Sequence, residues 1–153
     1  MALMFAQVHW VVCSLLIGWA AYSHARWFIF AEPGSRFSVV GYLLLAVLTY
    51  VFLFGTTKIA AWLTHWEASY RGLRLPRSVV ERGMYYHAVH YLPVAAAAAM
   101  TVLIYRLMLV RGLAGPQSTT TYLYVLCGEV VAGAMYLFKT YWTGMRNMMY
   151  ANH

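Results

Sequence analysis

Three histidines have the residue type and spacing of a cofactor or metal site. His87 and His90 are three residues apart and share one face of a predicted helix, and His9 is expected at a comparable depth on the first helix. Two imidazoles from different helices could be axial ligands of a b-type haem, and three could hold zinc or copper. Histidine also suits the interface between lipid and water, where its apolar body and polar tip are both satisfied. The sequence leaves these interpretations open, together with a site for a quinone or another apolar ligand.

His9 and Trp10 open the first predicted helix. In these residues it resembles the first helix of membrane b-type cytochromes, which have four-helix haem-binding bundles. That family also draws haem ligands from its last helix, whereas the last helix predicted here contains no histidine. The resemblance therefore assigns no ligand in this chain.

Glu129 is the second candidate for chemistry, because it falls about 12 Å inside the last predicted helix. A carboxylate at that depth needs a partner or a proton. Arg106 is expected about 6 Å inside the same end of the preceding helix, and its long side chain can reach inward. Glu129 and Arg106 are thus predicted to form an intramembrane ion pair. The alternatives are a protonated Glu129 bonded to a neighbouring helix, or a station on a proton or ion path.

Composition indicates which elements must position these residues. Of the 153 residues, 63% are hydrophobic and 10% are charged, so the chain is too apolar for a soluble domain of this size. The sequence predicts an all-α integral membrane protein, 1–153 forming a single membrane domain with four transmembrane helices in an up-down bundle. Turn residues place the helices at about 5–28, 37–66, 84–110 and 121–141, with a turn at Glu32–Arg36 and a basic surface loop at 67–83.

Four crossings put both termini and the basic loop on one face of the membrane, called side A here. Seven basic residues belong to side A and four to the opposite face, which favours a cytoplasmic or matrix location for side A and fits a bacterial cytoplasmic or a mitochondrial inner membrane. The histidines expected near side A are His9, His65, His87, His90 and His153. The side A cations are Lys58, Arg71, Arg74, Arg77, Arg82, Lys139 and Arg146, and the opposite face has Arg26, Arg36, Arg106 and Arg111.

The arginines of the basic loop are predicted to contact lipid. Arg71, Arg74, Arg77 and Arg82 could recognise an anionic phospholipid such as cardiolipin, or they could simply orient the chain and extend into the headgroups. The net charge of +7 is spread over both faces rather than one stripe, so nucleic acid is not an expected partner.

Small and aromatic residues indicate helix packing. Ser14 with Gly18 and Gly128 with Ala132 have small-x-x-x-small spacing, and Ala95–Ala99 lets another backbone approach closely.

Asp is absent, and no arrangement of nucleophile, base and orienting group is visible. The leading interpretation is a small, non-catalytic accessory or structural subunit of a larger membrane complex. The alternatives are an electron-transfer subunit that uses His9, His87 and His90, and a small transporter or channel that uses Glu129.

Overall fold

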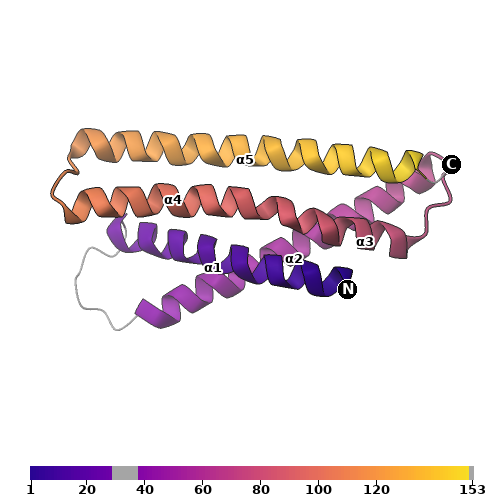
Figure 1. Cartoon of the computed structure of the whole chain (residues 1–153), viewed down its shortest axis with the longest axis horizontal. Helices are drawn as coiled ribbons and strands as arrows, with labels where there is room; N and C mark the ends of the chain where they lie inside the picture. Colours follow the sequence, from indigo (N-terminus) through magenta and orange to yellow (C-terminus); the bar gives the residue numbers. More distant parts are fainter. Residues whose placement is uncertain (29–37, 152–153) are drawn as a thin grey trace.

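The computed structural model describes residues 1–28 and 38–151 and is helical almost throughout (Figure 1). The elements are α1 (Ala2–Phe28), α2 (Ser38–Tyr70), α3 (Arg77–His87), the 3₁₀ turn η1 (Ala88–His90), α4 (Tyr91–Val110) and α5 (Pro116–Tyr150). No strand occurs in the described ranges. Four helical stretches, 2–25, 39–70, 77–110 and 116–150, are long and apolar enough to cross a membrane. The predicted all-α class and the four membrane-length helices are confirmed, while the predicted turn at 32–36 and His153 lie outside the described residues.

The segment predicted as a basic surface loop at 67–83 is mostly helical, so that boundary was wrong. α2 continues to Tyr70 and α3 begins at Arg77, which leaves only residues 71–76 outside a helix. Ion pairs at i,i+4 support both helix ends: Glu67 with Arg71 at 2.6 Å, and Arg77 with Glu81 at 3.2 Å. Polarity alone therefore misplaced the boundary, because these charged residues stabilise helical ends.

Glycine ends two of the helices in the same way. Gly72 and Gly112 have φ values of 75° and 67°. The Leu73 N–H donates to the Ala68 carbonyl at 2.9 Å, and the Leu113 N–H donates to the Met108 carbonyl at 2.9 Å. These are Schellman caps, which require a left-handed residue and so favour glycine. They reverse the chain sharply after α2 and after α4.

The last helix is longer than the predicted 121–141. It begins at Pro116, where a fixed φ suits the first helical position, and the Gly115 N–H donates to Ser118 Oγ at 2.7 Å. It continues to Tyr150. A proline also shapes the third stretch: Pro93 has no N–H for the carbonyl four residues earlier, and the 3₁₀ turn η1 precedes it.

The helices do not form a closed, symmetric bundle. α1 packs against α2 and α4, whereas α5 packs along α4 and α3 and meets α1 at the His24–Tyr122 contact (Figure 1). In Figure 1 the α2–α3 turn lies at the end where the C-terminus is drawn, and the α4–α5 turn lies at the opposite end. Trp10 is fully buried in the cluster that joins α1, α2 and α4, and its ring meets Phe54 edge-on at 5.4 Å.

The backbones of α1 and α2 approach each other closely at Gly18. A Cβ on Gly18 would lie 2.8 Å from Ala46 Cα, and Ser14, one turn earlier, is 4% exposed. The small pair Ser14 and Gly18 is thus used inside the chain, as close backbone approach requires.

Gly18→Ala is expected to destabilise the fold by about 1–3 kcal/mol, because the added methyl meets backbone that cannot move aside. The measurement is reversible unfolding of the detergent-solubilised protein. Gly55→Ala in α2 is the matched control, since nothing lies within 4 Å of its Cβ position. The control is expected to be neutral or stabilising by up to about 1 kcal/mol. Equal effects of the two substitutions would contradict the tight α1–α2 contact.

Candidate functional site: a polar seam between α4 and α5

Polar side chains gather where α5 faces α4 and the end of α3. On α5 they recur every three or four residues and so lie on one helix face, interrupted only by Leu126 and Gly133. Each forms a hydrogen bond to another helix. This polar seam consists of Thr119, Tyr122, Glu129, Tyr136 and Thr140 on α5, and of His24, Tyr105, Thr101, His90 and His87 on the opposing helices.

The end of the seam next to the α4–α5 turn is aromatic. Tyr105 and Tyr122 stack with ring centroids 4.1 Å apart, and each is only 5% exposed. The Tyr105 hydroxyl is 2.8 Å from Thr119 Oγ1, and the Tyr122 hydroxyl is 3.0 Å from His24 Nδ1 on α1. Since buried hydroxyls need partners, these contacts fix α1, α4 and α5 relative to one another.

Glu129 lies at the centre of the seam and is paired with Thr101, not with Arg106. Thr101 Oγ1 donates to Glu129 Oε1 at 2.5 Å, while Oε2 is buried without a hydrogen-bond partner among the described residues. Arg106 is exposed. It follows Thr101 by five residues, which turns it about 140° away around α4, so the predicted ion pair does not form.

The other end of the seam contains two of the three candidate histidines. His87 Nε2 is 3.0 Å from Thr140 Oγ1, and His90 Nδ1 is 2.8 Å from the Tyr136 hydroxyl. The two imidazole centroids are 4.9 Å apart. Both rings thus face α5 from the junction of α3 and α4.

His9 does not join them. Its Nδ1 is bonded to the Phe5 carbonyl at 2.8 Å in its own helix, and its ring packs on Phe5. α1 packs against Ala88 of η1, whereas His87 and His90 face α5, so similar depth did not mean proximity. Within the described part of the chain, no group of three His, Cys, Asp or Glu side chains could hold a metal ion. His87 and His90 also share one helix face, so they cannot approach a haem from opposite sides.

The middle of the seam is interrupted by an apolar contact. A Cβ on Gly133 would lie 2.8 Å from Val94 Cγ1, so the two helices touch there with no room for a side chain. Glu129 and Tyr136 are seven residues apart, or about 10 Å along α5, on either side of this contact. The seam is therefore a series of separate hydrogen bonds rather than a continuous polar path. Separate hydrogen bonds can fix the register of two helices, whereas ion transfer needs a continuous path.

The basic residues near the α2–α3 turn separate into paired and unpaired groups. Arg71 is bound to Glu67, and this hydrogen bond and the carboxylate charge raise the pKa of the Arg71 guanidinium. Arg77 shares Glu81 with Lys58, whose ammonium is 3.6 Å away. Arg74 and Arg82 form no ion pair with any described residue. The four arginines assigned together from the sequence thus differ in how freely they can bind a ligand.

Sequence reasoning missed most of the seam. Thr101, Tyr136 and Thr140 were not identified as partners, although the three- and four-residue spacing of polar side chains after position 116 is visible in the sequence. That spacing indicates one polar face on an otherwise apolar helix.

Thr101→Val is expected to destabilise the α4–α5 contact by about 0.5–2 kcal/mol, because it leaves both carboxyl oxygens of Glu129 without a partner. Unfolding in detergent is again the measurement. Thr101→Val combined with Glu129→Leu is expected to cost less than the sum of the single substitutions, as for residues in contact. Arg106→Gln is the control and should change the stability little. A loss of stability equal to that of Thr101→Val would show that Glu129 and Arg106 do form an ion pair.

Comparison with known proteins adds no identification. No protein family, curated protein or solved structure matches this chain. What the protein does must follow from its own residues and their placement.

Proposed function

We propose that this chain is a multi-pass membrane protein that acts as a small structural subunit, packing against the helices of a larger membrane complex. The observation that carries the proposal is the unfilled outer face of α5. Gly128 and Ala132 are both exposed there, and nothing lies within 4 Å of a Cβ placed on Gly128. By contrast, Gly18 and Gly133 are each filled by a neighbouring helix of the same chain.

The side chains around this notch are large and apolar. On the same helix, Tyr124, Val131 and Met135 are 75%, 61% and 69% exposed. Small residues between larger ones allow a second helix to approach closely, and in lipid such contacts supply much of the association energy. A second helix with a complementary ridge fits this surface better than mobile lipid chains alone.

A cavity of about 520 Å³ on the other side of α5 supports the same proposal. It is partly open and almost wholly apolar, and it lies where α1, α2, α4 and α5 approach one another. Phe52 of α2 and Leu137 of α5 line it, so these helices do not close on each other at this level. A partner side chain or an acyl chain would fill the space.

The proposed setting is a membrane crossed in up-down order with both termini on the cytoplasmic or matrix side. The length and apolar character of the four helices support the crossing. Seven of the eleven basic residues belong to that side in this arrangement, which supports the orientation. A bacterial cytoplasmic membrane and a mitochondrial inner membrane both satisfy these conditions.

Gly128→Leu is expected to lower the amount of co-purifying partner proteins at least tenfold, because the branched side chain fills the notch that a partner helix would enter. The measurement is extraction from native membrane in mild detergent, followed by quantitative mass spectrometry and an absorption spectrum of the same sample. Gly144→Leu is the matched control: it adds the same bulk to the same helix, about 160° around, where nothing lies within 4 Å either. It should retain the partners.

Two outcomes would contradict the subunit role. One is a wild-type chain that leaves the native membrane as a monodisperse particle without partners. The other is a visible Soret band that belongs to this chain, which would favour an electron-transfer role instead.

A further inference from the structure

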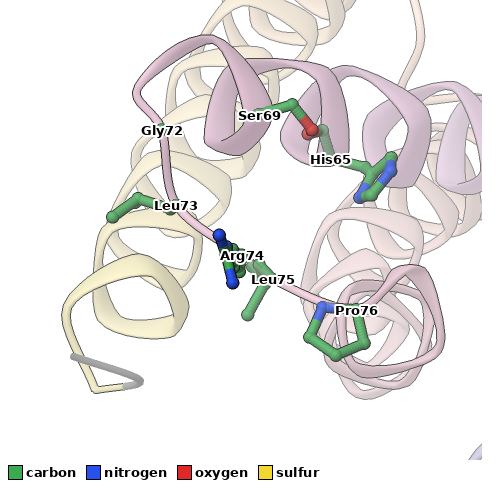
Figure 2. Close-up of a pocket in the computed structure, with 7 residues that line it drawn as sticks. All are labelled: His65, Ser69, Gly72, Leu73, Arg74, Leu75 and Pro76. Atoms are coloured by element: carbon green, nitrogen blue, oxygen red, sulfur yellow. The ribbon is translucent and has the colours of Figure 1, made fainter.

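An open pocket with polar and apolar lining lies at the α2–α3 turn (Figure 2). Its volume is about 470 Å³, and His65, Ser69, Arg74 and Pro76 are among the side chains around it. Figure 2 shows His65 and Ser69 extending from the last turns of α2, and Arg74 extending from the chain that crosses to α3. The pocket thus brings residues from two elements around one hollow.

The turn that forms the pocket is held in place by its backbone. The Gly72 N–H donates to the Ser69 carbonyl at 3.0 Å, which completes the Schellman cap of α2. Leu75 follows and is only 5% exposed, packed in the cluster that joins α2, α3 and α5. The backbone at Arg74 is therefore held between a capped helix end and a buried anchor.

Arg74 is a cation without a carboxylate. Its neighbours in the sequence, Arg71 and Arg77, are paired with Glu67 and Glu81, whereas Arg74 forms no ion pair in the described residues. Residues 67–82 include four arginines and two glutamates, so their net charge is +2. The uncompensated charge at the pocket favours an anion.

His65 adds an unsatisfied polar atom. Its Nδ1 is buried and has no hydrogen-bond partner among the residues that the structure describes, unlike Nδ1 of His9, which bonds to its own helix. The Ser69 hydroxyl donates to the His65 carbonyl at 2.9 Å and leaves its oxygen as an acceptor. Buried polar atoms without partners are uncommon in native structures and often mark a ligand or water site.

Aromatic side chains place the pocket at the level of lipid headgroups. Trp62, Trp66 and Tyr70 recur every four residues on α2, are 59%, 57% and 80% exposed, and lie beside the helix face of His65 and Ser69. Exposed Trp and Tyr of this kind are typical of the membrane interface.

We propose that the pocket at the α2–α3 turn binds the phosphate of an anionic phospholipid, with Arg74 as the main charged partner and His65 as a second polar contact. The acyl chains would extend along the exposed apolar face of α2. This inference rests on the proposed membrane location but not on the subunit role.

The test titrates the detergent-solubilised full chain with phosphatidylglycerol, phosphatidylcholine or inorganic phosphate and counts bound molecules by native mass spectrometry. Wild type is expected to bind phosphatidylglycerol in preference to phosphatidylcholine. Arg74→Gln should weaken phosphatidylglycerol binding about five- to tenfold. Arg71→Gln removes the same charge from a guanidinium already bound to Glu67 and should change binding by less than about twofold. His65→Ala should weaken binding by less than Arg74→Gln.

Equal losses of phosphatidylglycerol binding from Arg71→Gln and Arg74→Gln would contradict a specific site at the pocket and would indicate binding by diffuse surface charge. Displacement of the lipid by millimolar inorganic phosphate would contradict the assignment of a phospholipid as the ligand and would indicate a site for a soluble anion. The readout needs no partner, so a failure of the subunit proposal would leave a positive lipid result intact.

Discussion

Helices that are apolar on every side have little to fix their rotation, and the polar seam supplies that constraint here. A uniformly apolar helix can turn or slide against its neighbour at small cost, because lipid and a leucine side chain are similar environments. The hydrogen bonds of Thr119, Glu129, Tyr136 and Thr140 each have one partner on the opposing helices, so only one register satisfies them together. The outward direction of Gly128 follows from that register.

The sequence was sufficient for the fold class because the apolar runs are long and Pro and Gly interrupt them at the ends. It was insufficient for the charged helix ends, where Glu67 and Arg71 support a helix whose polarity resembled that of a loop. Such ion pairs stabilise a helix because the two residues are four positions apart, and a count of polar residues ignores this spacing.

Two predicted groupings, Glu129 with Arg106 and His9 with His87 and His90, do not form, because depth along a helix does not determine direction around it. Arg106 was expected at a suitable depth for Glu129, but it points away, and Thr101 takes its place. His9 likewise shared a predicted level with His87 and His90, but those two rings face α5, whereas the His9 ring is bonded to its own helix. Rotation is set by contacts between helices, including the Gly133–Val94 contact, and these become visible only in three dimensions.

The short turn between α4 and α5 has a consequence for how the protein is made. α5 is the least apolar of the four membrane-length helices, and alone in a bilayer its glutamate and hydroxyl groups would be exposed to lipid. Residues 111–115 tether it to the helix whose side chains receive those groups. In the proposed membrane, the two helices are therefore best delivered to the bilayer together, as a hairpin leaving the insertion machinery with its polar faces already opposed. The biosynthetic unit is then the pair, not the single helix.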